Sequence, residues 1–230
     1  MAALHNISFQ EFFLDISIQL QRISKSFSDK VLFADLSYTF HKKVYHIIGK
    51  NGVGKSTLLR LIVGLDFPDS GAVMLNNKYS VRDNSVNAKK LFYVPDDLAL
   101  YPFLTGKEFL SWIANARTKN VDEIEELIER FELQQHLNTL IADMSFGTKK
   151  KFLLSSALIG QPDFIILDEP LNGLDKKSQQ VLLLLLQEKV NQSGILLTTH
   201  HDAHLNRLNP IKVEVLGHRL ITNSCTPLVV

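Results

Sequence analysis

Nine consecutive residues near position 50 have the types and spacing needed to hold a phosphate group. They read Gly-Lys-Asn-Gly-Val-Gly-Lys-Ser-Thr and fit the pattern G-x-x-x-x-G-K-S/T through Gly49, Gly54, Lys55 and Ser56. The glycines allow successive backbone N–H groups to curl round an oxyanion without interference from a Cβ atom. Lys55 would reach the outer phosphates as a point charge, and the Ser56 hydroxyl would ligate Mg²⁺.

The segments on either side of this loop supply the elements that the loop needs. Val44–Ile48 is an apolar, β-prone run, and the run after Lys55 reads as a helix. The N-terminal end of such a helix carries a partial positive charge, which would point at the same anion. A glycine-rich turn that binds nothing is the alternative, but the order of strand, loop, Lys-Ser and helix favours phosphate binding.

A pair of acidic residues follows a second apolar run. The run at 164–167 is apolar throughout and ends at Asp168 and Glu169. In open parallel sheets, ligands bind at the carboxyl ends of the strands. We therefore expect Asp168 to hold Mg²⁺, directly or through water, and Glu169 to point at an attacking water. Exposed acidic pairs are common, so this inference depends on the buried strand and on the loop upstream.

The pattern along the chain predicts an α/β protein with a parallel sheet, an N-terminal antiparallel β layer and an inserted α-helical region. Alternating residues at 14–20 and a β-prone run at 31–40, joined by a turn at 26–30, predict the antiparallel layer. Helices after Thr105 and from Val121 predict the insert, the second with Asn120 and Glu123 as a capping pair.

Further elements of the same pattern complete a single domain over 1–230. Turns are expected at 66–71 and 76–77, and further strands or a helix at 72–75, 89–94, 176–190, 195–199, 211–216 and 218–222. We expect the core to comprise 14–95 and 155–230 and the helical insert to comprise 96–154.

Composition and charge exclude several classes of protein. The net charge of +1 gives no indication of binding to nucleic acid or to an anionic membrane surface. Cys225 is the single cysteine, which excludes an internal disulfide and fits a reducing compartment. No Lys or Arg precedes Arg22, so we expect no signal peptide, and the longest apolar run, 181–186, is too short to span a bilayer. We expect a soluble chain whose membrane role, if any, comes through a partner.

Taken together, the motifs resemble the nucleotide-binding subunit of ATP-binding cassette (ABC) transporters, over almost the whole chain. Walker A and Walker B, at 49–57 and 164–169, are shared with many ATPases, whereas the order of all the motifs is specific to ABC proteins. Those motifs also include an adenine-stacking aromatic at Phe27, a Q-loop after 93–95, a signature at 144–148, a D-loop at 172–175 and a switch histidine at His200. The resemblance implies a P-loop NTPase core with ATP and Mg²⁺ as cofactors.

The resemblance also implies a role for each site residue. Lys55, Glu169 as general base and His200 at the γ-phosphate would be catalytic, and Ser56, Asp168 and Asp96 would face Mg²⁺. ATP would contact Phe27, Gly49, Asn51, Gly52, Gly54, Lys55, Ser56 and Thr57, with Ser145 and Gly147 contributed by a second subunit.

Several of these residues have a plainer interpretation. His200 could be a surface histidine, Phe27 could serve local packing, and Asp175 could cap a helix. His200 with His201 and His204 could suggest zinc, but no cysteine lies nearby.

Two motifs depart from the family's pattern. The Q-loop has Asp96 in place of Gln, and an ionised carboxylate can approach Mg²⁺ but cannot donate a hydrogen bond. In the signature, Phe146 replaces a Gly and Thr148 replaces Gln, which adds bulk where close backbone approach is expected. Residues 149–151 are all Lys at the start of the next helix, where cations oppose the helix dipole. They could bind an anion that arrives there, or they could form a solvated basic turn.

The leading expectation is that the chain is the ATPase subunit of a membrane transporter. The altered Q-loop and signature favour an exporter over an importer. The family implies a head-to-tail dimer, expected here to be of identical chains, and a separate permease that places the chain at the cytoplasmic face of the membrane. Tyr101, Pro102 and Phe103 are candidates for the permease contact, with core packing of the aromatics as the alternative.

Two other functions stay open at this point. A soluble cassette ATPase acting on nucleic acid or ribosomes is one, although its usual basic extensions are absent from the sequence. A nucleotide-binding regulatory module with little turnover is the other, motivated by Phe146, Thr148 and Asp96. No Asn-Lys-x-Asp motif is present, which disfavours a GTPase.

Overall fold

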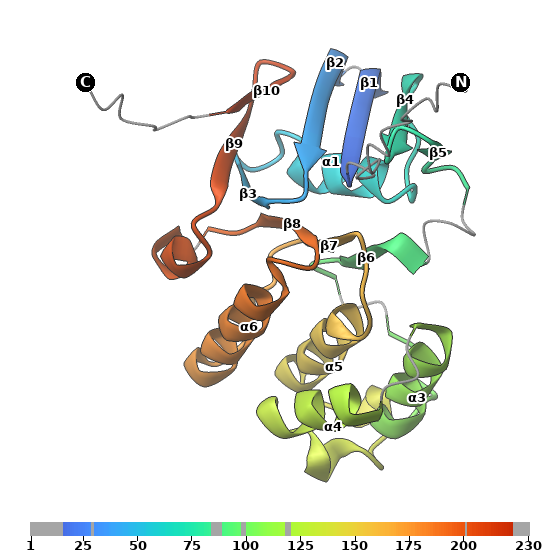
Figure 1. Ribbon diagram of the computed structural model, residues 1–230, viewed down its shortest axis with the longest axis vertical. Helices are drawn as coiled ribbons and strands as arrows, with labels where there is room; N and C mark the ends of the chain where they lie inside the picture. Colours follow the sequence, from blue (N-terminus) through green and yellow to red (C-terminus); the bar gives the residue numbers. More distant parts are fainter. Residues whose placement is uncertain are drawn as a thin grey trace, which may run out of the picture.

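Two β-sheets and a group of helices form successive layers in the computed structural model (Figure 1). The structure describes residues 16–28, 30–83, 89–97, 100–117, 121–200 and 202–222. The strands are β1 Ser17–Phe27, β2 Lys30–His41, β3 Val44–Ile48, β4 Ser70–Leu75, β5 Tyr79–Ser80, β6 Leu91–Val94, β7 Phe164–Leu167, β8 Gly194–Thr198, β9 Ile211–Leu216 and β10 Arg219–Thr222. The helices are α1 Lys55–Ile62, α3 Gly106–Arg117, α4 Val121–Arg130, α5 Phe146–Leu158 and α6 Lys176–Lys189, with short 3₁₀ turns at 134–136, 141–143 and 202–208.

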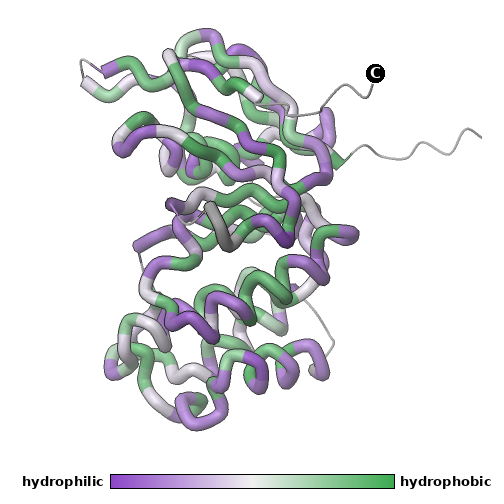
Figure 2. The backbone as a smooth tube through the Cα atoms, turned by 90° about the vertical axis from the view of Figure 1, so that its left-hand side faces the viewer, coloured by the Kyte–Doolittle hydropathy of each residue, from purple (hydrophilic) through white to green (hydrophobic). Residues whose placement is uncertain are grey.

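The larger sheet has the strand order β10-β9-β3-β8-β7-β6. Strands β9, β3, β8, β7 and β6 pair in parallel, and β10 pairs antiparallel with β9 at one edge. Every residue of β7 and of β8 is buried, as expected for strands covered on both faces. The expected mostly parallel sheet is confirmed, and its central strands run mainly green, hydrophobic, across the middle of the molecule in Figure 2.

The smaller sheet, β2-β1-β4-β5, is antiparallel and confirms the expected N-terminal β layer. Helix α1 packs between the two sheets, and its buried leucines share one core with residues of β1, β2 and β3. The expected turn at 26–30 is wrong in extent, because Ser26 and Phe27 still pair with Val31 and Lys30 in the β1–β2 ladder. Asp69 supports this longer strand, since its carboxylate accepts a hydrogen bond from the Ser26 backbone N–H.

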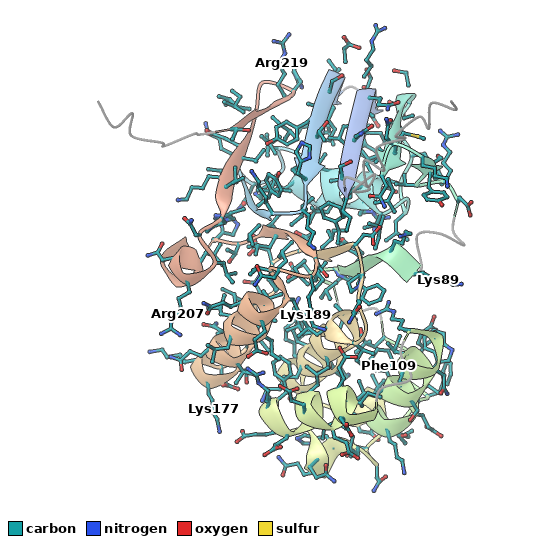
Figure 3. All side chains as sticks on the ribbon, viewed as in Figure 1. Lys89, Phe109, Lys177, Lys189, Arg207 and Arg219 are labelled. Carbon is teal, nitrogen blue, oxygen red and sulfur yellow. The ribbon has the colours of Figure 1, made fainter. Side chains whose placement is uncertain are left out.

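Helices α3, α4, α5 and α6 lie together on the opposite side of the larger sheet (Figure 1). Thr105 begins α3 with a reciprocal capping pair, because Glu108 Oε2 accepts from the Thr105 N–H and Thr105 Oγ1 accepts from the Glu108 N–H. Phe109, labelled in Figure 3, belongs to a core that these helices share with β6, β7 and β8.

Two boundary predictions in this region need correction or fall outside the structure. Strand β6 starts at Leu91 rather than at Lys89, because Lys89 and Lys90 are helical and Lys90 pairs with Asp163 at 2.9 Å. Asn120, the expected capping residue, lies outside the described residues. The carboxylate of its expected partner, Glu123, contacts Lys189, labelled in Figure 3, at 2.9 Å.

Within the part of the chain that the structure describes, no helix has both the length and the apolar character required to cross a bilayer.

Arg117 fastens the end of α3 to α5 and to the sheet. Its guanidinium lies 3.6 Å from the centroid of the Phe92 ring and donates to the Ser156 carbonyl near the end of α5. Burial lowers the pKa of Arg117 to about 10. Because α5 carries functional candidates at its other end, this contact contributes to the placement of the site.

We expect Arg117→Met to lower the free energy of unfolding by about 1–3 kcal/mol, because the Ser156 carbonyl loses its buried donor. Urea denaturation followed by circular dichroism would measure this loss. The matched control is Arg82→Met, since Arg82 lies 5.0 Å from the ring centroid of the exposed Phe67 and should contribute less than about 1 kcal/mol. Equal losses in the two variants would contradict the anchoring role of Arg117.

Candidate active site

A cavity of about 350 Å³ lies at the carboxyl ends of the parallel strands. It brings together segments that are far apart in the sequence, namely the loop after β3, the acids after β7 and the histidine after β8. Its lining comprises Leu32, Asn51, Gly52, Gly54, Lys55, Ser56, Thr57, Asp96, Asp168, Glu169, Asn172 and His200. Most of the predicted site residues therefore share one cavity.

The phosphate-loop segment folds as its glycines permit. Gly54 has φ 113° and is the N-cap of α1, a backbone conformation that an L side chain rarely adopts. The Lys55 ammonium folds back over the loop and donates to the carbonyls of Gly49 at 2.9 Å and Lys50 at 3.3 Å. The loop thus holds a cation beside the backbone N–H groups that begin α1.

Thr198, at the end of β8, fixes the acidic pair after β7. Its hydroxyl donates to Asp168 Oδ1 at 2.6 Å and accepts from the Glu169 backbone N–H at 2.9 Å. Sequence reasoning missed this residue, because a threonine inside an apolar run indicates only a β-strand. The hydroxyl holds Asp168 so that its carboxylate remains at the cavity wall.

Glu169 has three features that are unusual for a glutamate. Its backbone has φ 44°, and such strain in a non-glycine residue often accompanies function. Its side chain is largely buried, and Oε2 has no hydrogen-bond partner among the described residues. Burial raises the pKa of Glu169, and His200, whose Nε2 lies 3.4 Å from Oε1, opposes that rise. A carboxylate oxygen is therefore available to accept a proton.

The oxygen donors in this cavity fit Mg²⁺. Ser56, Asp168 and Asp96 all line it, and a hydroxyl with one or two carboxylates is typical of magnesium sites that are completed by phosphate and water. The zinc alternative stays untested, although the described residues contain no group of three or more His, Cys, Asp or Glu arranged to hold a metal. The side chains of His201 and His204 lie outside the described residues.

None of the described residues that line the cavity belongs to the signature segment, 144–148. Ser145 is exposed and caps α5, where its Oγ accepts from the Thr148 N–H at 3.2 Å. The Phe146 ring lies against Gly173, where an added Cβ atom would sit 2.1 Å from the ring. The Phe146 ring thus fits because Gly173 has no side chain.

One of the two interpretations of the lysines after the signature, the solvated basic turn, is wrong. Lys149 donates to the Ala142 carbonyl at 3.0 Å, and Lys151 lies 3.6 Å from Asp175 Oδ2. Lys150 is buried, and its Nζ donates to the Pro95 carbonyl at 3.3 Å. The segment is therefore not a plain solvated basic turn, whereas the arrival of an anion at this turn stays a prediction.

The predicted adenine-stacking residue is not part of the cavity lining. Phe27 ends β1 with half of its surface exposed, and Lys25 Nζ lies 4.9 Å from the centroid of its ring. The ring is therefore not part of a core, its contact with Lys25 fits the local-packing alternative, and its contact with a base stays a prediction.

A second hollow, of about 330 Å³, opens on the surface of the helical region. It is lined by Tyr101, Phe103, Leu104 and Trp112, and Tyr101 packs edge-on against Trp112 with 5.2 Å between the ring centroids. Phe103 is 70% exposed, so the core-packing alternative for these aromatics is wrong. We call these four residues the aromatic hollow.

Comparisons with known proteins agree with this geometry. The family model described as "ABC transporter" matches residues 33–172. The zinc import ATP-binding protein ZnuC of Rickettsia conorii is 32% identical over 220 residues, which cover 91% of this chain and 88% of that protein. The Nod factor export ATP-binding protein I of Sinorhizobium fredii is 31% identical over 200 residues, covering 84% of this chain and 58% of that protein.

Solved structures share the fold. One described as an ATP-binding subunit of an ABC transporter has a TM-score of 0.79 and 29% identity, and the match covers 88% of this chain and 87% of that one. A dimeric bacterial ABC transporter cassette has a TM-score of 0.75 at 20% identity, covering 88% and 96%, which shows likeness of fold alone. The chain thus belongs to the ABC transporter family, as an ATP-binding subunit that hydrolyses ATP for transport.

Proposed function

We propose that ATP and Mg²⁺ bind in the cavity at the strand ends, and that a separate permease uses the energy of hydrolysis. The observation that carries this proposal is the convergence of Lys55, Ser56, Asp168, Glu169 and His200 on one cavity. A phosphoryl group transferred to water needs positioning and charge neutralisation, and these side chains offer both.

In this proposal the phosphate loop binds and orients the nucleotide. Phosphate oxygens would accept hydrogen bonds from the loop N–H groups and from the start of α1. Lys55 would give up its hydrogen bonds to the loop carbonyls and bind the outer phosphates. Ser56 and Asp168, with Asp96 nearby, would hold Mg²⁺, which supplies positive charge to the phosphates when bound. Thr198 keeps the Asp168 carboxylate in place for that task.

Glu169 is proposed as the general base. Its unpaired Oε2 can accept a proton from the attacking water, and its raised pKa brings it closer to the working pH of a base. His200, 3.4 Å from the other oxygen, would hold this carboxylate in orientation and contact the γ-phosphate. Both groups reach the same cavity from the ends of adjacent strands.

We expect Glu169→Gln to reduce ATP hydrolysis by at least about 100-fold, because the amide cannot accept the proton, while ATP binding persists. Phosphate release and binding of a fluorescent ATP analogue would be measured on the same protein. Glu125→Gln, on the exposed face of α4, is the matched control and should keep full activity. Retained hydrolysis in Glu169→Gln would exclude Glu169 as the base.

A second copy of the chain is proposed to complete the site. Ser145 and Gly147 are displaced from their own cavity, and the dimeric cassette that shares this fold shows that such chains can pair. In the proposed head-to-tail dimer, the α5 N-terminus of one subunit would face the phosphates bound by the other. Bound nucleotide would then stabilise the dimer, and hydrolysis would release it.

We expect Ser145→Asp to abolish ATP-dependent dimerisation. Aspartate caps a helix as well as serine does, so α5 should persist, whereas the added negative charge would repel the partner's phosphates. Sedimentation of the Glu169→Gln background with ATP and Mg²⁺ would measure the dimer fraction. Ser111→Asp, on the exposed face of α3, is the control; a dimer that survives Ser145→Asp would contradict the proposed geometry.

The aromatic hollow is proposed as the contact surface for the permease. Large aromatic side chains that remain exposed around a shallow hollow are typical of protein–protein interfaces. The hollow lies on the helical region rather than beside the phosphate cavity, so the permease would not block nucleotide binding.

We expect Phe103→Ser to weaken association with the permease by about tenfold, since aromatic anchors dominate such contacts. Co-purification with a candidate permease, sought among the membrane proteins of the same cell that bind the unmodified chain, would measure the loss, and ATP binding should stay unchanged. Leu216→Ser, exposed at the end of β9, is the control. Equal co-purification of both variants would place the permease contact elsewhere.

The direction of transport is proposed to be export. This proposal rests on the residues at 96, 146 and 148, which differ from the family's usual Q-loop and signature. Relatives include an import protein and an export protein at similar identity, so the decision depends on the permease. Uptake or release of substrate by vesicles that contain the assembled transporter distinguishes the two directions.

A further inference from the structure

Lys150 has a completely buried side chain, which is rare for a lysine. It projects from α5 toward the segment after β6, where its Nζ donates to the Pro95 carbonyl and lies 3.9 Å from Asp96 Oδ1. Burial lowers the pKa of Lys150, and the nearby carboxylates, led by Asp96 and followed by Asp168 and Glu169, oppose that shift. The ammonium group therefore lies behind the acidic wall of the phosphate cavity.

Asp96 occupies the other side of this contact, at the rim of the cavity. Its side chain is half exposed, and Oδ1 also accepts a hydrogen bond from Asn172 Nδ2 at 3.4 Å. One carboxylate thus connects three parts of the molecule: the segment after β6, helix α5 and the loop after Glu169.

Neither charge is favourable at this place by itself. A buried ammonium without a partner carries a desolvation penalty. A third carboxylate beside Asp168 and Glu169 would add like-charge repulsion at the cavity. The two charges together are neutral, which explains how an acid can stand at position 96 of this chain.

We propose that Asp96 and Lys150 form one charge-compensated positioning pair, which holds the rim of the phosphate cavity to helix α5. Ser145 caps the same helix about one and a half turns before Lys150. If Asp96 moved toward a bound cation, its contact with Lys150 would therefore shift helix α5 and, with it, the signature turn of the same subunit. This link to the signature rests on the proposed function, whereas the pairing itself does not.

The pairing is tested on the nucleotide-free chain by a double-mutant cycle in urea. In the unmodified chain, we expect Asp96→Gln to lower the urea concentration at the unfolding midpoint, because Lys150 loses its counter-charge. In a chain that already carries Lys150→Gln, we expect Asp96→Gln not to lower this midpoint. Asp96→Gln combined with Lys149→Gln is the control and should be additive, since Lys149 contacts Ala142 instead. Additivity in the Lys150 cycle overturns the proposal. If a single variant does not fold, the double variant must recover folded protein, and its failure also overturns the pairing.

The effect on the cavity is tested by the ratio of ATP dissociation constants without and with Mg²⁺. Lys150→Gln removes a cation behind the acids, so the ratio should rise by about three- to tenfold. Asp96→Gln should lower the ratio, and the double variant should return it toward that of the unmodified chain. A lysine that serves packing alone would leave the ratio unchanged, and that result overturns the electrostatic role. A chain that binds no ATP under any condition would refute the proposed function, while the urea cycle would still test the pair.

Discussion

The insertion of β8 between β3 and β7 is the constraint on which the whole candidate site depends. Because the three strands are parallel, the phosphate loop, the acidic pair and His200 all emerge at one edge of the sheet. Thr198 then joins two of these strand ends with a single hydroxyl, which contacts both Asp168 and the Glu169 backbone. A sheet with β8 at its far edge would take Thr198 and His200 away from Asp168 and Glu169.

The rigid core also supports features that are unfavourable when taken singly. Glu169 combines a left-handed backbone with a buried carboxyl, and Lys150 has a completely buried side chain. Such conformations persist only where the surrounding structure determines them fully, and here completely buried strands enclose them. The strain and the charge are concentrated around one cavity, which is where preorganised groups contribute to chemistry.

Sequence patterns predicted the strand–loop–helix unit, the acidic pair and the two kinds of sheet, because each has a strong local signal. They could not predict Thr198 or Lys150, whose roles depend on partners in distant segments. The sequence placed residues 149–151 at the start of a helix, but three consecutive lysines do not indicate which of them faces inward. The end of β1 was misplaced for a related reason: polar residues resemble a turn, but Asp69, distant in sequence, stabilises them as a strand. Local signals therefore define elements, and tertiary contacts decide the remaining side chains.

The contact of Phe146 with Gly173 restricts how the sequence of this chain can change. The ring occupies the space where any side chain at position 173 would begin, and Gly173 also has φ 75°. A side chain at 173 would therefore meet two separate obstacles, the Phe146 ring and its own backbone conformation. A smaller residue at 146 would remove the first obstacle and leave the second, so a bulky signature turn and a glycine in the following loop depend on each other in one direction only: position 146 can change without a clash, and position 173 cannot.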